Sequence, residues 1–167
     1  MSPSTTTLLD EISNNKIETL HLTEDPEEYF TNPKEFAAAM EQNTSIKKVF
    51  FEKDFIACLK GNERAIVVSA VGNLPNVETV QLKDSLLMVG ICVTNLVKNA
   101  KKLSSLSMEN CVLQGVPEDF TKLHDAIKEN SSVKSLKIGD DCTPTYKVDL
   151  KELCSDLKIN VSVPSAA

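Results

Sequence analysis

The sequence contains few of the residues from which catalytic and metal sites are built. Among its 167 residues there are 2 histidines, 5 glycines and 5 cysteines. The cysteines are odd in number and include no C-x-x-C pair, which fits neither a disulfide framework nor a zinc knuckle. The glycines are isolated from one another, so no Gly-rich phosphate-binding loop exists. We therefore expect a reduced intracellular protein with no cofactor, no metal site and no enzymatic activity.

Long apolar runs and an excess of positive charge are absent as well. The longest strongly apolar stretch, 86–97, is interrupted by Gly90, Thr94 and Asn95 and is too short to span a bilayer. The N-terminus lacks the basic start and apolar run of a secretory signal. A formal net charge of -6 argues against nucleic acid or an anionic membrane as the main target and suits a basic partner better. These features favour one cytoplasmic domain.

The residues that could still support chemistry have simpler explanations. His21 and His124 have no catalytic partner at a characteristic spacing, and we expect His124 to be a surface residue of a helix. Cys92, Cys111 and Cys154 are expected to pack as small core side chains, inert unless deprotonated. The acidic runs lack the ligand spacing and glycine of a calcium loop, so we interpret them as solvated loop charge.

An internal repeat gives the strongest indication of the fold. Five segments share the pattern apolar-x-x-apolar-x-apolar, and neighbouring segments begin 26 to 31 residues apart. A unit of this length holds one strand and one helix. The segments are 17–22, 46–51, 77–82, 103–108 and 133–138. We expect a strand in each of them.

The stretches between these segments carry a helical pattern in register with the repeat. Two apolar residues, four positions apart, precede each later segment by ten and six residues. Residues four apart lie on one face of a helix, so each stretch presents one apolar stripe to the strands. The pairs are Phe36 and Met40, Val67 and Val71, Val93 and Val97, and Leu123 and Ile127. The alternation predicts an α/β fold with a parallel sheet and helices outside it.

Turn residues agree with this alternation. Asn14, Asn43 and Asn130 each stand three residues before a strand segment, where a helix should end and a left-handed residue is expected. The run 32–35 predicts a helix start with an asparagine cap, a first-turn proline and a carboxylate at the third position, and 117–119 predicts another. Apolar spacing near the two ends predicts a short helix around residues 8–12, a final helix over 150–157 and a further strand within 159–163.

The run from Leu103 to Leu113 resembles the leucine-rich-repeat signature. Leu103, Leu106 and Met108 are followed by Cys111, where the family carries Asn or Cys, and by Leu113. The other repeats place Asp25, Asp54, Ser85 and Asp141 at the position of Cys111. Repeats of this length with an alternating helix are similar to the ribonuclease-inhibitor type of the family.

This resemblance implies a right-handed α/β solenoid with its sheet on the concave face and its helices on the convex face. Residues 1–16 would form an N-terminal cap, 17–142 about five repeats and 143–167 a C-terminal cap. The family resemblance also implies a monomeric adaptor or regulatory scaffold that binds another protein. The negative net charge predicts no nucleic acid or membrane partner. The expected contact surface is the concave sheet together with the adjacent loops.

Strand alternation predicts which side chains face a partner on that sheet. The central row is His21, Phe50, Gln81, Ser107 and Lys137, and the flanking candidates are Lys48, Glu52, Lys83 and Glu109. Phe50 is the expected anchor, because an exposed aromatic ring concentrates binding energy. The alternative is that a loop covers Phe50 through Tyr29 and Phe30, or through Phe55. The loop 23–31, which carries Tyr29 and Phe30, is a second candidate contact.

Two narrower functions are also suggested. The segment 33–51 is similar to the C-terminal repeat domain of tropomodulin, a family that caps actin filaments, and this similarity implies actin or another cytoskeletal partner. Some proteins of the repeat type stimulate small GTPases by inserting an arginine. Arg64 is the single arginine of this chain, but its expected place at a helix start rather than directly after a strand favours an ordinary exposed residue.

Overall fold

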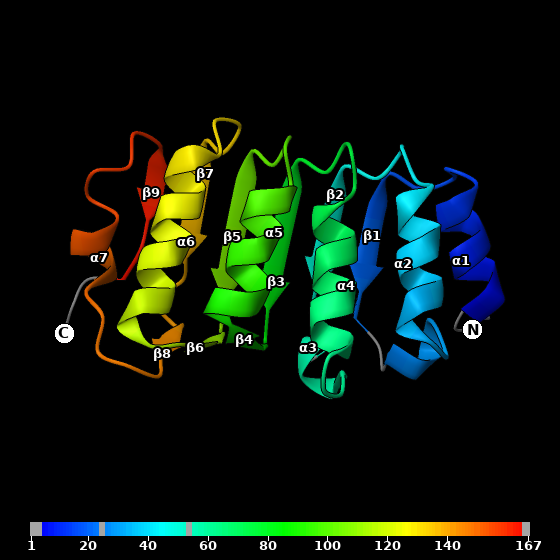
Figure 1. The fold of residues 1–167 in the computed structure, drawn as a ribbon, viewed down its shortest axis with the longest axis horizontal. Helices are drawn as coiled ribbons and strands as arrows, with labels where there is room; N and C mark the ends of the chain where they lie inside the picture. The colour runs from blue at the N-terminus through cyan, green and yellow to red at the C-terminus, as the bar shows by residue number, and fades with distance from the viewer. Residues whose placement is uncertain (1–4, 24–25, 53–54, 165–167) are drawn as a thin grey trace.

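Neighbouring strands of this protein pair in parallel and in the order in which they occur along the chain. The computed structural model describes residues 5–23, 26–52 and 55–164. Within these residues, a six-stranded sheet has the order β1-β2-β3-β5-β7-β9, visible in Figure 1. Its strands are β1 (Thr19–Leu22), β2 (Lys48–Phe51), β3 (Thr79–Lys83), β5 (Ser105–Glu109), β7 (Ser135–Ile138) and β9 (Asn160–Ser162). The predicted α/β class with a parallel sheet is confirmed.

The strand register aligns equivalent residues of the sequence repeat. Leu20, Val49, Val80, Leu106, Leu136 and Val161 form one row across the large sheet and face its helical side. The next row consists of His21, Phe50, Gln81, Ser107, Lys137 and Ser162. Because side chains alternate along a strand, the second row faces away from the helices. Its first five residues are the central row expected from the sequence, and Ser162 extends the row onto β9.

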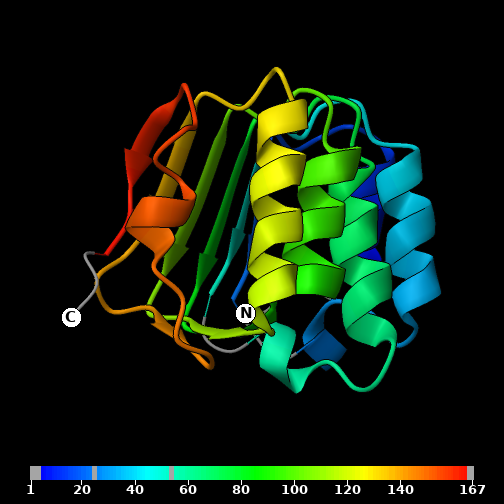
Figure 2. The ribbon, with the colours of Figure 1, turned by 60° about the vertical axis from the view of Figure 1, so that its left-hand side comes forward.

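The helices cover one face of the large sheet, as Figure 2 shows. They are α1 (Thr5–Ser13), α2 (Pro33–Glu41), α4 (Glu63–Gly72), α5 (Thr94–Asn99) and α6 (Pro117–Glu129). Shorter pieces are η1 (Pro26–Glu28), α3 (Phe55–Cys58), the π-helical turn η2 (Val89–Val93) and α7 (Leu150–Leu153). Every member of the four predicted apolar pairs is buried, so the helical stripes pack on the sheet as expected.

Both predicted helix starts are observed. Asn32 caps α2, because its Oδ1 accepts the backbone N–H of Lys34 at 2.9 Å. At the start of α6, Asp119 Oδ2 accepts the backbone N–H of Val116 at 2.9 Å. These side chains satisfy amide groups that have no partner inside the helix.

The turn asparagines work differently from the prediction. Positive φ occurs at Asn15 (57°) rather than at Asn14, and neither Asn43 nor Asn130 has it. Instead, Asn43 Nδ2 donates to Ile12 O of the preceding turn at 2.7 Å. Asn130 Nδ2 donates to Val97 O at 2.8 Å and to Ala100 O at 2.9 Å. Their amide side chains connect successive turns of the chain through hydrogen bonds.

A second, smaller parallel sheet was not predicted. It consists of β4 (Leu86–Met88), β6 (Val112–Gln114) and β8 (Thr143–Pro144). Its register pairs Val112 with Thr143, so Cys142, not Asp141, is the structural equivalent of Cys111. The prediction for Asp141 was therefore wrong by one residue, because the turn after β7 is one residue longer. The corresponding positions Asp25 and Asp54 lie outside the described residues.

The ends of the chain follow the predicted pattern in part. Helix α1 buries Leu8 and Ile12, as expected for the N-terminal helix. At the other end α7 is a single turn of four residues, shorter than the helix predicted over 150–157, and β9 supplies the further strand. No helix among the described residues combines the length and apolar character needed to cross a bilayer.

Candidate functional site

The face of the large sheet that points away from the helices is the candidate site. We call it the open face and define it by the row His21, Phe50, Gln81, Ser107 and Lys137 with its flanking residues. His21 and Lys137 are exposed, whereas Phe50, Gln81 and Ser107 are partly exposed. Lys48 is exposed beside this row, and Glu52, Lys83 and Glu109 are partly exposed. The structure thus gathers all nine predicted sheet residues on one surface.

An aromatic pair stands at the centre of the first two strands. The rings of His21 and Phe50 stack with their centroids 5.0 Å apart and an interplanar angle of 13°. The two residues are direct partners in the parallel register of β1 and β2. Stacking restrains both rings, so the open face presents a flat apolar surface with an imidazole beside it.

The loop around Tyr29 and Phe30 does not serve the role predicted for it. Tyr29 and Phe30 are buried, with exposed fractions of 8% and 4%. Their rings pack on Phe55, with centroid distances of 5.7 and 6.4 Å. The prediction of Tyr29 and Phe30 as partner contacts was therefore wrong. The alternative in which these rings cover Phe50 is also wrong, because they lie in the core and Phe50 stacks on His21.

Charged groups of both signs border the open face. Lys137 Nζ donates to Glu109 Oε1 at 2.8 Å. This hydrogen bond, with the attraction between the two charges, raises the pKa of Lys137. Lys83 is the register partner of Glu109 on β3. The carboxyl ends of the strands therefore carry the ion pair between Lys137 and Glu109, with Lys83 beside it. Lys48 lies at the opposite, amino end of its strand.

His124 is a bridging residue rather than the plain surface residue expected from the sequence. Its Nε2 lies 2.6 Å from Asp156 Oδ1 and its Nδ1 lies 2.9 Å from Asp125 Oδ1. Lys128 Nζ donates to Asp156 Oδ2 at 2.9 Å. The hydrogen bond that the His124 ring donates to the Asp156 carboxylate is the main cause that raises the pKa of His124. The cluster fastens the segment before β9 to α6.

Most thiols lie in the core, as expected for Cys92, Cys111 and Cys154. Burial raises the pKa of Cys92, and it raises that of Cys154 to about 11. Cys111 and Cys142 directly precede the neighbouring strands β6 and β8, and their mutual hydrogen bond raises the pKa of Cys111 and lowers that of Cys142 to about 7. Both sulfurs remain buried, which shields them from reagents. Among the described residues, no group of three or more His, Cys, Asp or Glu side chains could hold a metal ion.

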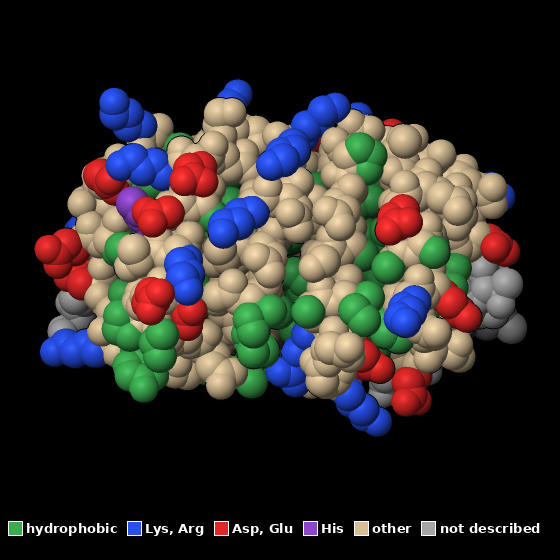
Figure 3. All heavy atoms as spheres, in the orientation of Figure 1, with side chains coloured by type: hydrophobic (Ala, Val, Ile, Leu, Met, Phe, Trp, Pro, Cys, Tyr) green, Lys and Arg blue, Asp and Glu red, His purple; other side chains and the backbone are tan. Residues whose placement is uncertain are grey.

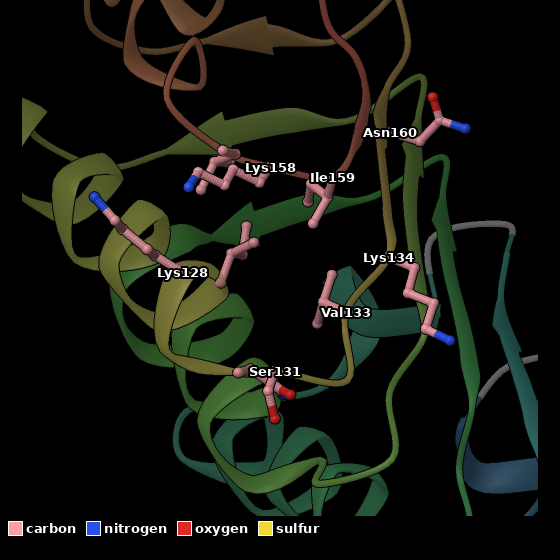
Figure 4. Close-up of a pocket in the computed structure, with 10 residues that line it drawn as sticks. Lys128, Ser131, Val133, Lys134, Lys158, Ile159 and Asn160 are labelled. Carbon is pink, nitrogen blue, oxygen red and sulfur yellow. The ribbon is translucent and has the colours of Figure 1, made fainter.

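A hollow of about 750 Å³ lies between α6 and the segment that leads into β9. In Figure 4, Val133 and Ile159 point toward each other across it, whereas Lys134 and Asn160 point away. The described residues that line it include no histidine, cysteine or carboxylate. We interpret it as a result of the short α7, which covers less of α6 than a full helix would.

Arg64 is held by the backbone that precedes its helix. Its Nε donates to Leu59 O at 3.0 Å and its Nη2 donates to Ala57 O at 3.1 Å. These bonds join the start of α4 to the turn after α3, and the residue is partly buried.

Comparisons with known proteins add no assignment: a scan against family models found no match, and a search of curated proteins found none.

Proposed function

We propose that this chain is a leucine-rich-repeat solenoid that binds a partner protein in the cytoplasm and catalyses no reaction. The observation that carries the proposal is the stacked pair His21 and Phe50 on the open face. Partly exposed aromatic rings that are held rigidly are common centres of binding energy in protein interfaces. The face around them offers complementary polar groups rather than a catalytic constellation.

The arrangement of the chain supports the repeat architecture. Strands follow one another in sequence order, each helix packs on its neighbour, and the helices lie on one side of the sheet. In a repeat protein each unit buries its apolar side on the adjacent units. The face without helices is then available for recognition, and single side chains on it can be changed without opening the core.

The open face also indicates the chemistry of a partner. The ring of Phe50 suits an aliphatic or aromatic side chain, while Gln81 and Ser107 offer hydrogen bonds farther along the same row. Lys48 and Glu52 stand before and after Phe50 on the same side of the sheet. A partner with an apolar side chain between groups of opposite charge would match this order.

The test compares partners captured by the native chain and by the double variant Phe50→Ala, Lys48→Glu. Captured proteins are identified by mass spectrometry, and the strongest one is purified for calorimetry. We expect the double variant to bind at least about tenfold more weakly, since an anchor ring contributes roughly 1.4 kcal/mol or more. Lys34→Glu on the exposed side of α2 is the matched charge control and should bind as the native chain does. Equal affinity of the double variant, with its fold intact, would refute the proposal.

Actin capping remains a narrower proposal for the same surface. The segment that resembles tropomodulin forms α2, the bridging Asn43 and strand β2, which supports the repeat architecture but does not favour actin over other proteins. An elongation assay at the pointed ends of actin filaments tests it directly. Unchanged elongation at saturating protein would remove this proposal and leave the general one in place.

Regulation of a small GTPase would depend on Arg64. Two backbone carbonyls engage its guanidinium, and this engagement supports a structural role for the side chain. GTP hydrolysis by a panel of purified small GTPases, measured with and without the native chain, tests the idea. Stimulation that Arg64→Ala abolishes would favour GTPase regulation, and the absence of stimulation would end it.

A further inference from the structure

The most exposed large hydrophobic side chains of the described residues gather at one edge of the molecule. Ile91, Val112, Val116 and Tyr146 have exposed fractions of 51%, 43%, 44% and 55%. They belong to the small sheet or to the turns around it. Figure 1 shows β4, β6 and β8 along the lower edge, and Figure 3 shows hydrophobic side chains on that edge beneath the helices. Exposed apolar side chains that cluster in this way mark interaction surfaces.

A cavity of about 450 Å³ opens within this apolar edge. Ile91, Val116 and Tyr146 line it together with Met88, Gln114 and Asp119. On the small sheet, Met88 and Gln114 are register partners, and Val112 lies two residues before Gln114 on the same face of β6. The exposed hydrophobic residues thus form one continuous surface around a cavity.

Two glycines let a carboxylate reach the cavity wall. A Cβ atom on Gly90 would lie 2.5 Å from Asp119 Oδ1, and one on Gly115 would lie 3.1 Å from Asp119 Cβ. Larger residues at these positions would displace Asp119. Its Oδ2 accepts the N–H of Val116, while Oδ1 lies beside Gly90. The cavity therefore combines apolar walls with one negative group that is fixed by the start of α6.

The edge strand β8 of the small sheet is not suited to receive another strand. Thr143 and Thr145 donate their N–H groups inward, to Cys111 O and Leu113 O, both at 2.9 Å. The residue between them is Pro144, which has no N–H to offer on the outer side. A partner at this edge would therefore dock through its side chains rather than by strand addition.

The charges around the apolar edge select among partners. Asp140 and Asp141 are exposed just before β8, and Glu118 is exposed at the start of α6. Lys147 is exposed after Tyr146, and Lys122 pairs with Glu118 at 3.3 Å. With Asp119, acidic groups exceed basic ones. An anionic membrane or the same edge of a second copy would meet like charge here.

We propose that this edge is a second docking surface, which binds a short amphipathic protein segment with basic flanks. Apolar side chains of the segment would fill the cavity between Ile91, Val116 and Tyr146. A lysine or arginine of the segment would pair with Asp119. This surface is separate from the open face, so the two can bind different proteins at once.

The probe for this proposal is a fluorescein-labelled peptide of alternating leucine pairs and single lysines, with a central phenylalanine. Anisotropy measures its affinity for the native chain and for the double variant Ile91→Ser, Tyr146→Ser, which changes exposed side chains alone. We expect the variant to bind about tenfold more weakly or worse. Asp119→Asn should weaken binding in low salt more than in high salt. Phe50→Ala should leave the affinity unchanged, which separates this surface from the open face.

Specific results would overturn the proposal. A peptide with serine in place of leucine and phenylalanine that binds equally well would show attraction by charge alone. Unaltered affinity of the Ile91→Ser, Tyr146→Ser variant would place the peptide elsewhere. Sedimentation that reveals a dimer of the native chain, lost in this variant, would assign the edge to self-association. Binding of the native chain to anionic or neutral lipid vesicles that the variant loses would make the edge a membrane contact.

Discussion

Asn43 and Asn130 each join two turns of the chain through a single amide side chain. Asn43 has no exposed surface, and its Oδ1 accepts the N–H groups of Ser45 and Ile46 at 3.0 and 2.8 Å. Its Nδ2 donates to Ile12 O. The side chain thereby pairs backbone groups from two different turns, and its bonds to Ile12 O and to the N–H of Ile46 are buried. A buried polar group without a partner costs more than a hydrogen bond contributes.

Replacing Asn43 by alanine should therefore destabilise the fold strongly. We expect a loss of about 2–4 kcal/mol in the free energy of unfolding, since several buried groups lose their partner. The matched control is Asn14→Ala. Asn14 is exposed and makes one local side-chain bond to Asp10 O, so its loss should cost less than about 1 kcal/mol. Urea denaturation measures both variants, and equal losses would show that the bridge contributes nothing.

Thiol reactivity should separate one cysteine from the rest. Cys58 is exposed, whereas Cys92, Cys111, Cys142 and Cys154 are buried. Because a reagent must reach the thiolate, we expect one fast equivalent in a native thiol titration at pH 8 and four that react on unfolding. Cys58→Ser should remove the fast phase. A fast phase that survives this substitution would indicate that the Cys142 thiol, whose pKa is lowered to about 7, becomes accessible in solution.

The two aromatic predictions had different outcomes for a physical reason. Phe50 lies inside a strand, where alternation fixes the direction of each side chain. Tyr29 and Phe30 directly follow η1, outside any periodic pattern. Burial there depends on Phe55, which comes from a distant part of the sequence. Sequence alone could therefore place Phe50 on the open face but could not place Tyr29 and Phe30 in the core.

At the scale of elements, α6 holds the last strand through side-chain ion pairs rather than through helix packing. Helix α6 packs closely on α5, but α7 is a single turn. His124 and Lys128 on α6 both bond Asp156, which precedes β9. These bonds hold the pKa of Asp156 at about 2, with Lys128 as the first cause. The attachment of β9 should therefore depend on pH.

The direction of this pH dependence follows from the pKa shifts of His124 and Asp156. His124 has a raised pKa, so its contribution is complete below its unfolded value of about 6.5 and is lost as the pH rises through the folded value. Asp156 contributes above about pH 4, and this is lost as the pH falls toward 2. We expect the hydrogen-exchange protection of β9 to fall from pH 6 to pH 9. His124→Gln should remove that fall, and amides of β3 serve as the control. An equal fall in the variant would exclude His124 as the cause.

Short elements were harder to predict than long ones. The strands of the small sheet contain two or three residues, too few for alternation to be distinguished from chance. Leu113 belongs to the repeat signature, but the signature does not predict hydrogen bonding between β4, β6 and β8. The one-residue extension after β7 has no signal in the pattern. The pairing of Val112 with Thr143 reveals this extra residue.

For the molecule as a whole, the repeat pattern predicted the order of the strands, because the described strands of successive repeat segments pair with one another in the large sheet. Paired strands of the large sheet stand 25 to 31 positions apart in the sequence. A period of that length is visible in the apolar residues themselves. The apolar edge was missed because Ile91, Val112, Val116 and Tyr146 follow no repeat. Their exposure results from how β4, β6 and β8 meet the start of α6.

Nearest-neighbour packing also predicts a gradient of stability from the middle to the C-terminal end. Val80 and Val161 belong to the same cross-strand row, but Val80 is fully buried and Val161 is half-buried. Val80→Ala should lower the free energy of unfolding by about 2–3 kcal/mol, through lost burial and the cavity left behind. Val161→Ala should cost less than about 1 kcal/mol, because less apolar surface is lost from the core. Both variants make the same chemical change in a strand, so the difference between them in urea denaturation reports their positions alone. Equal losses would mean that β9 is as firmly packed as β3, which would contradict the view that α7 leaves the last turn incompletely covered.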